Sequence, residues 1–277
     1  MKSYLKAFFF KALSYGLLAA SREQNLENLV QKLKTIIPDL SDQYVTFKVE
    51  NKFLERKVRN LHAFQMRLIM DSVNIIQKEK ENVVLVDIGD SSGNHLIYLK
   101  HLMSNIESIS VNSDKEAVRR INMKGLKSIE SRAEELHKNT EFNQSADIFV
   151  SLEMLEHLES PTTFLTDMSE KSECKLFVIT VPLVNTSRVG LYQIRNARDD
   201  RPLSPENTHI FELSPDDWDL LFRYSGWKIT NRYKYFQYPK KSPLTFLRFF
   251  WKMLDDFDGF YGVILEKDDT YIKRKTS

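Results

Sequence analysis

The sequence predicts an α/β protein with a doubly wound, mostly parallel sheet and a helical extension at its N-terminus. Two observations carry this prediction. Short apolar segments alternate with amphipathic segments through residues 82–267, an order that is typical of a parallel sheet covered by helices on both faces. Before residue 82 the apolar residues recur at helical spacing, which indicates helices without strands.

The composition is that of a folded protein with balanced charge. The chain has 277 residues, of which 42% are apolar, and 40 Lys and Arg face 38 Asp and Glu. The apolar content excludes a disordered chain, and the balanced charge argues against nucleic acid as a partner. The single cysteine, Cys174, excludes a disulfide framework and a cysteine-based zinc site. It fits a reducing cytoplasm.

The first twenty residues combine a basic start with an apolar stretch, as a cleaved signal peptide also does. Lys11 interrupts this stretch, and the uncharged part that remains, residues 12–20, is too short to span a bilayer. We therefore expect an amphipathic helix, with peripheral contact to a membrane surface as one role.

Residues 1–81 are predicted to form a helical extension, helical throughout to about residue 80. Apolar residues repeat at spacings of three and four over 23–37, where Pro38 stops the helix, and again over 52–80.

Residues 82–277 are predicted to form the α/β domain. The expected strands are residues 83–86, 106–111, 147–152, 175–181, 227–236 and 260–266. The expected helices are residues 94–103, 114–122, 161–170 and 214–225, the second capped by Asp114. Two inserts interrupt the domain, an irregular one at 183–208 and an aromatic, helical one at 243–255.

A glycine-bearing turn follows the first predicted strand. Asp87 ends the strand, and Gly89 and Gly93 precede the next helix. In open α/β sheets such a turn is a ligand site, because the helix amides point at the ligand. A dinucleotide site needs a further glycine where Ser91 stands. The Asp87 carboxylate would repel a pyrophosphate, whereas it suits a ligand with an ammonium and a sulfonium group.

Residues 87–93 (DIGDSSG) resemble the first motif of class I S-adenosylmethionine-dependent methyltransferases. Three further segments match that family in order and spacing, at 111–114 (VNSD), 131–134 (SRAE) and 147–158 (DIFVSLEMLEHL). The resemblance covers about residues 82–267. It implies a Rossmann-like sheet with an antiparallel last strand, S-adenosylmethionine as cofactor, and methyl transfer as the reaction.

The resemblance also implies which residues hold the cofactor. They are Asp87, Gly89, Asp90, Gly93, Asn112, Ala133, Glu134, Ser151, Leu152 and Glu153. Asp87 and the two glycines would hold the methionine end, Asn112 the ribose, and Ala133 with Glu134 the adenine edge. Three residues depart from the family pattern: Ser91 replaces a glycine, and Asn112 and Arg132 replace acidic residues. These departures keep open a catalytically decayed protein that binds partners through a methyltransferase fold.

A second group of residues has the composition of a metal site. Glu153, Glu156 and His157 stand at spacings of three and four, which would place them on one helical face, and His209 is a fourth candidate. Carboxylate and imidazole groups together bind divalent ions such as Mg²⁺ or Mn²⁺. The pattern resembles ubiquinone-pathway O-methyltransferases and small-RNA 2′-O-methyltransferases, which implies a metal beside the transferred methyl. In a metal-free mechanism, His157 or His209 would be the catalytic base.

The remaining motifs bear on the acceptor. The first insert contains Arg188, Arg195, Arg198 and Arg201, which points to an anionic acceptor, with an ordinary solvated surface insert as the alternative. Residues 243–254 interleave aromatic and basic residues, as do segments that pack into a core, contact a membrane surface or join subunits. His62, His95, His101 and His137 are expected to be ordinary helix or surface residues. The preferred reaction is O-methylation of a small molecule or glycan precursor, with metal-dependent RNA 2′-O-methylation as an alternative.

Overall fold

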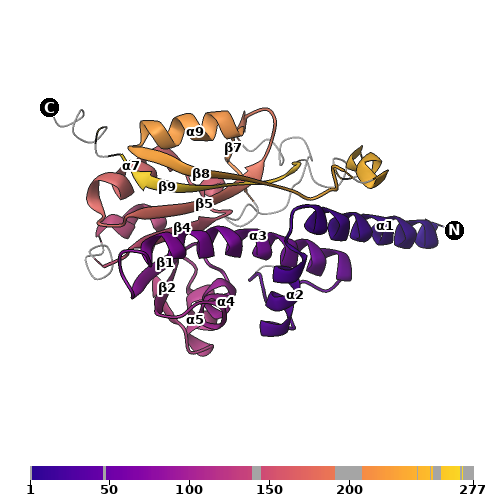
Figure 1. The fold of residues 1–277 in the computed structure, drawn as a ribbon, viewed down its shortest axis with the longest axis horizontal. Coiled ribbons are helices and arrows are strands. Elements are labelled where there is room, and N and C mark those ends of the chain that lie inside the picture. The colour runs from indigo at the N-terminus through magenta and orange to yellow at the C-terminus, as the bar shows by residue number, and fades with distance from the viewer. Residues whose placement is uncertain are drawn as a thin grey trace.

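The structure is a computed structural model that describes residues 2–45, 48–138, 145–190, 208–241, 243–249, 251, 257–268 and 270. A seven-stranded sheet in the order β3-β2-β1-β4-β5-β9-β8 runs through its centre (Figure 1). The strands are β1 Val83–Ile88, β2 Ile106–Asn112, β3 Lys127–Glu130, β4 Ile148–Leu152, β5 Leu176–Leu183, β8 Trp227–Phe236 and β9 Gly259–Lys267.

Strands β1 to β5 pair in parallel, and β9 is antiparallel to both of its neighbours, β5 and β8. The predicted fold class, a mostly parallel sheet with an antiparallel last strand, is therefore confirmed. Because β1 to β5 are parallel, their carboxyl ends meet at one edge of the sheet, which is the edge where open α/β folds bind ligands.

The helices lie close to their predicted positions. They are α1 Lys2–Glu23, α2 Glu27–Ile36, α3 Lys52–Ile76, α4 Asn94–Leu102, α5 Lys115–Met123, α7 Pro161–Lys171 and α9 Pro215–Tyr224. Three short 3₁₀ segments are η1 Ala133–Lys138, η2 Leu155–His157 and η4 Pro243–Leu247, and a small ribbon pairs β6 Arg188–Val189 with β7 Phe211–Glu212. The Asp114 carboxylate accepts a hydrogen bond from the Glu116 amide, so it caps α5 as predicted.

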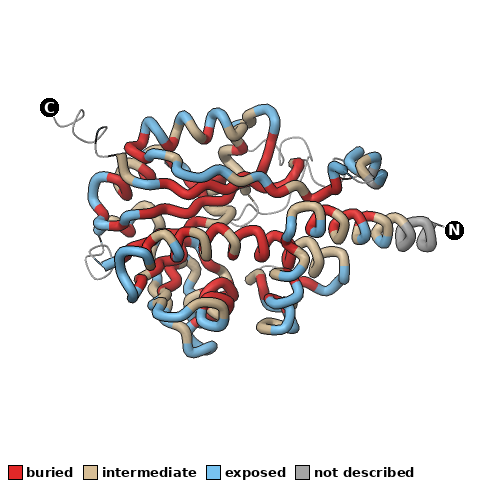
Figure 2. The backbone as a smooth tube through the Cα atoms, in the orientation of Figure 1, coloured by how far each residue is buried: buried red, intermediate tan, exposed pale blue. Residues whose placement is uncertain are grey.

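Two hydrophobic cores cover the two faces of the sheet. On one face, Trp218 and Phe222 of α9 pack with Phe164 of α7. On the other face, α2, α3 and α4 pack against β1 and β4. The central strands are buried along their length (Figure 2), and every residue of β5 is buried. Strands buried on both faces need apolar residues on both sides, which explains their uninterrupted apolar sequences.

The N-terminal extension is not helical throughout. Helix α2 ends at Ile36 and α3 begins only at Lys52, and the described residues of the connection between them, 37–45 and 48–51, are not helical. Pro38 lacks an amide hydrogen and disfavours a helical conformation in the residue before it, so the chain leaves the helix there. In this connection, Leu40 and Val49 pack against Val58 of α3.

Helix α1 extends away from the sheet (Figure 1). Its buried residues Leu13 and Leu17 form a cluster with Tyr238 and Trp251, and the Trp251 ring stacks on Phe53 of α3 with 5.6 Å between centroids. The apolar stripe of α1 and the Trp251 indole therefore serve packing within the chain. Among the described residues, no helix combines the length and the apolar character that crossing a bilayer requires.

Gly262 sets how closely α3 approaches the sheet. A Cβ atom there would lie 2.9 Å from Cζ of Phe64 and would also strike Leu68. Gly262→Val should therefore lower the free energy of unfolding by about 1–3 kcal/mol, the usual cost of overpacking a core. The urea midpoint measures this loss, and Glu266→Gln at an exposed position of the same strand should leave the midpoint unchanged. Equal midpoints for the two variants would contradict the close packing.

Candidate active site

The turn after β1 is held by its own side chains. Gly89 and Gly93 have φ values of +90° and +74°, a region that L-residues avoid. The Asp90 carboxylate accepts hydrogen bonds from the amides of Ser92 and Gly93, at 3.0 and 2.9 Å. A Cβ atom on Gly89 would lie 2.8 Å from Cγ of Met154. The glycine turn therefore lies directly against the segment that follows β4.

Two buried carboxylates flank this turn. Asp87 and Asp90 are 2% and 6% exposed, and each has one oxygen, Oδ2, without a hydrogen-bond partner among the described residues. Nδ1 of His95 lies 3.3 Å from Oδ2 of Asp87, and the two carboxylates raise the pKa of this imidazole. Burial raises the pKa of Asp87 to about 6, although His95 opposes the rise. One imidazole can balance the charge of at most one of the two carboxylates. A second positive group, such as a ligand ammonium, would balance the other.

His95 is a correction to the sequence analysis, which expected an ordinary helix or surface residue. It is buried, and its Nε2 lies 3.1 Å from Oε1 of Gln65 in α3. The Gln65 amide in turn donates to Oγ1 of Thr180 in β5 at 3.3 Å. His62 is buried as well, with Nδ1 3.4 Å from the Tyr98 hydroxyl. The contact with Gln65 spans 30 residues of chain, which no local pattern reveals.

Asn112 and Ser91, two departures from the family pattern, have structural roles. The Asn112 amide donates to the Asp90 carbonyl at 2.8 Å, and its oxygen accepts from the Asp114 amide at 2.8 Å. The Ser91 hydroxyl donates to the Gln43 carbonyl at 2.9 Å. The N-terminal extension therefore lies against the glycine turn, and Asn112 braces the turn from β2. The ribose contact of Asn112 stays a prediction.

The other predicted cofactor residues lie along the same edge of the sheet. Ser151 is paired with Ile88 in the register of β4 and β1, and its buried hydroxyl has no hydrogen-bond partner in the described part of the chain. Leu152 is the next residue of β4. Ala133 and Glu134 begin η1, in a loop that the Ser131 amide ties to the Asn112 carbonyl at 3.0 Å.

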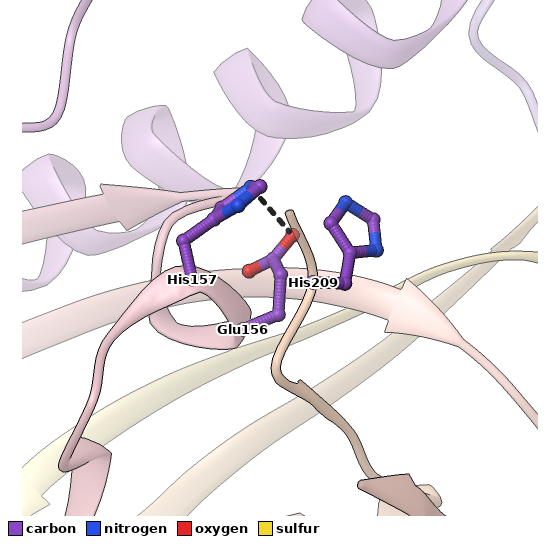
Figure 3. A group of neighbouring side chains, drawn as sticks. All are labelled: Glu156, His157 and His209. Atoms are coloured by element: carbon purple, nitrogen blue, oxygen red, sulfur yellow. Dashed lines mark ion pairs between the residues drawn. The ribbon is translucent and has the colours of Figure 1, made fainter. Parts of the chain in front are cut away.

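Glu156, His157 and His209 converge beside the turn. Their ligand atoms all lie within 4.8 Å of one another. Nε2 of His157 is 3.9 Å from Oε1 of Glu156, and the two imidazole centroids are 4.7 Å apart. In the view of Figure 3 the Glu156 carboxylate lies between the two imidazoles. The structure thus brings together three of the four predicted metal ligands.

Glu153 is the exception, and the reason is local. The sequence analysis placed it on a helical face with Glu156 and His157, but Glu153 has a φ of +53°, and only residues 155–157 form a 3₁₀ turn. The Glu153 amide donates to the Thr180 carbonyl at 2.9 Å, and its carboxyl hydrogen-bonds the Thr180 side chain. Glu153 is therefore outside the converging group. From its position it raises the pKa of Glu156.

Both imidazoles are oriented through Nδ1. His157 donates from Nδ1 to the Thr208 carbonyl at 2.9 Å, and His209 donates from Nδ1 to Glu212 at 2.8 Å. Arg188 holds the other oxygen of Glu212 at 2.6 Å. These bonds leave Nε2 of each imidazole as the nitrogen that can bind a metal. In metal-binding histidines the other ring nitrogen typically has such a hydrogen-bond partner. The roles of Glu212 and Arg188 were not predicted, although Glu212 stands three residues after His209.

The charges of this group favour a cation. Burial and the His209 side chain lower the pKa of His157 to about 4, so its imidazole is neutral, as metal ligands are. Burial and the neighbouring Glu153 raise the pKa of Glu156 well above its usual range. Neither oxygen of Glu156 has a hydrogen-bond partner among the described residues. One carboxylate and two imidazoles are a suitable donor set for a divalent metal with open positions.

Of the four arginines of the first insert, the structure describes Arg188. Arg188 is bound to the buried Glu212, so its charge supports the cluster. Arg195, Arg198 and Arg201 lie outside the described residues.

Two solved structures share the fold. A chain from the complex between the Haloferax volcanii Trm112 methyltransferase activator and a methyltransferase has a TM-score of 0.50 at 13% identity, covering 74% of this chain and 94% of that one. A protein described as a sarcosine dimethylglycine methyltransferase from Galdieria sulphuraria has a TM-score of 0.53 at 11% identity, covering 79% and 88%. No family model and no curated protein sequence matches the chain. The chain therefore has the fold of methyltransferases, which agrees with the fold that the resemblance of residues 87–93 implied.

Proposed function

We propose that this chain is an S-adenosylmethionine-dependent methyltransferase that methylates a hydroxyl of a small molecule or glycan precursor. One observation carries the proposal. Gly89 of the cofactor turn lies against Met154, two residues before Glu156. The candidate cofactor site and the carboxylate–histidine cluster are therefore adjacent at the carboxyl edge of the sheet, as transfer between two bound molecules requires.

The cofactor supplies a methyl group that its sulfonium already activates. In this proposal, Asp87 and Asp90 bind the ammonium of its methionine end, because Asp90 offers a buried oxygen without a hydrogen-bond partner in the described chain and Oδ2 of Asp87 has His95 as its neighbour at 3.3 Å. Gly89 and Gly93 allow the tight turn, because a Cβ atom on either would strike Met154 or Leu126. Ser151 offers a buried hydroxyl at the same edge.

The cluster would prepare the acceptor. A bound Mg²⁺ or Mn²⁺ lowers the pKa of a hydroxyl that it coordinates, and Glu156, His157 and His209 would hold it. In the metal-free alternative, Nε2 of His157 or His209 takes the hydroxyl proton. The pKa of His157, about 4, favours the metal for that residue, because an effective general base has a pKa near the working pH.

Two observations bear on the alternatives. The Asn112 side chain already hydrogen-bonds the Asp90 carbonyl and the Asp114 amide. If the cofactor does not bind, these bonds support the alternative of a decayed scaffold that binds partners. An RNA 2′-O-methyltransferase would use the same cluster, but the net charge of +2 gives no excess of cations for a phosphate backbone. We expect the protein to act in the cytoplasm, where a lone thiol such as that of Cys174 stays reduced.

Calorimetry with S-adenosylhomocysteine tests the proposed function. The wild-type chain should bind it, and Asp87→Asn should bind about ten-fold to a hundred-fold more weakly, the usual loss for a charged hydrogen bond. Wild-type affinity should also fall as the pH drops through about 6, because the Asp87 carboxyl becomes protonated and loses its attraction for the ammonium. Asp87→Asn should lack this pH dependence. A wild-type chain that binds no S-adenosylhomocysteine would establish the decayed scaffold instead.

A further inference from the structure

A cavity of about 340 Å³ opens beyond β5, outside the carboxylate–histidine cluster. Its walls come from the ends of β5 and β8, the residue before β9, the start of α9 and the segment 243–249. Three cationic side chains line it: Lys234, Lys240 and Arg248. Two carboxylates, Asp216 and Asp258, line it as well.

Aromatic rings position two of the cations. The Lys240 ammonium lies 3.3 Å from the centroid of the Phe236 ring, and the Arg248 guanidinium lies 5.5 Å from that of Tyr238. Both rings line the cavity. Burial and the charges of Arg248 and Lys234 lower the pKa of Lys240, so the positive charges are close enough to repel one another. An anion placed among them would relieve that repulsion.

The two carboxylates do not balance the three cations. Asp258 accepts from Asn185 at 2.8 Å and pairs with Arg248 at 3.5 Å, so its charge is matched within the wall. In the described chain, neither Lys234 nor Lys240 forms an ion pair, and Asp216 is the one remaining carboxylate of the lining. The cavity therefore has an excess of positive charge.

The cavity is joined to the candidate active site by three short pieces of chain. Leu183 in its wall is three residues along β5 from Thr180, which contacts Glu153. A strand advances about 3.3 Å per residue, so the two positions are about 10 Å apart. The second piece runs from Asn185 to Arg188, and the third runs from Ser214 back to Glu212. Arg188 and Glu212 form an ion pair, and Glu212 also binds His209.

We propose that this cavity binds an anionic group, a phosphate or a carboxylate, that the methyl acceptor carries in addition to its reacting hydroxyl. The acceptor role rests on the proposed function, whereas binding of an anion by the cavity does not. Lysine and arginine side chains beside aromatic rings recognise such groups through charge-assisted hydrogen bonds.

Calorimetry with inorganic pyrophosphate on the whole chain tests the site directly. Wild-type protein should bind it, and Lys234→Gln combined with Lys240→Gln should weaken binding at least about ten-fold. The matched control combines Lys228→Gln and Lys241→Gln, which removes two exposed lysines that do not line the cavity. The control should bind like the wild type. Absence of wild-type binding, or equal losses in the two double variants, would overturn the proposal.

Vesicles distinguish a lipid-borne phosphate from a soluble one. Phe246 and Phe249, 64% and 68% exposed, flank Arg248 at the cavity. A lipid-borne group predicts co-sedimentation with phosphatidylglycerol vesicles but not with phosphatidylcholine vesicles, and loss of it in the Lys234 and Lys240 double variant. A soluble group predicts pyrophosphate binding without co-sedimentation. If the double variant still co-sediments with the vesicles and still binds pyrophosphate like the wild type, the proposed anion site would be overturned.

The two proposals fail separately. The Lys234 and Lys240 double variant should bind S-adenosylhomocysteine like the wild type, because neither lysine belongs to the cofactor turn. A chain that binds S-adenosylhomocysteine but not pyrophosphate would overturn the anion site alone. A chain that binds pyrophosphate through these lysines but no S-adenosylhomocysteine would overturn the methyltransferase proposal and leave the anion site standing.

Discussion

Glu156→Gln should remove Mn²⁺ binding, with a loss of affinity of at least about a hundred-fold, because it deletes the only carboxylate in the converging group. Glutamine keeps the volume of the side chain, so the cavity that an alanine would leave does not confuse the result. Calorimetry with MnCl₂ measures the loss. The heat stability that Mn²⁺ adds to the wild type should disappear in the same variant, since a ligand stabilises only the state that binds it.

The same variant has clear controls. S-adenosylhomocysteine affinity should stay within about two-fold, because Glu156 belongs to the proposed acceptor cluster and not to the proposed cofactor residues. Glu159→Gln, three residues along the chain at an exposed position, should bind Mn²⁺ like the wild type. If the wild type binds no Mn²⁺ and chelation with EDTA changes nothing, the metal is excluded. The metal-free mechanism then predicts that His157→Asn or His209→Asn alone removes the pH dependence of methyl transfer.

Gly89→Val should abolish binding of S-adenosylhomocysteine, with a loss of about a hundred-fold or more. Valine adds a branched side chain at a φ of +90°, where its Cβ would lie 2.8 Å from Met154. The turn must then shift, and it carries Asp87 and Asp90 with it. Because Met154 precedes Glu156 by two residues, a shift of the turn also disturbs the cluster.

A substitution at another glycine is the control for the effect of backbone strain. Gly125 has a φ of +72°, and a Cβ there would meet nothing within 4 Å. Gly125→Val should therefore destabilise the fold by a similar strain term while binding S-adenosylhomocysteine like the wild type. Thermal unfolding of the two variants separates stability from binding. Unchanged affinity in Gly89→Val would show that the cofactor does not bind at this turn.

Most elements of the central sheet and its helices were predictable because local signals define them, although β3, Lys127–Glu130, was not among the expected strands. The apolar segments marked the central strands, Pro38 marked the end of α2, and Asp114 marked the cap of α5. The prediction of a wholly helical extension was wrong for residues 37–45 and 48–51. In that stretch, packing of Leu40 and Val49 on Val58 replaces helical hydrogen bonds, and such packing has no local signature.

The residues of the candidate site also fall into two sets, those that the sequence predicted and those that only the structure revealed. The sequence predicted Asp87, Gly89 and Gly93 as candidates, because the turn they form is built from neighbouring residues, and it predicted Glu156, His157 and His209 from their spacing, their chemical type and the family resemblance. Only the tertiary structure excluded Glu153 from the converging group.

The tertiary structure also decided the states of the site's side chains. It brought His95 onto Asp87, oriented His209 through Glu212, and formed the cavity lined by Lys234 and Lys240. The physical reason is distance along the chain. Turns and caps depend on residues a few positions apart, whereas burial, pKa and imidazole orientation depend on groups that only the folded sheet brings together.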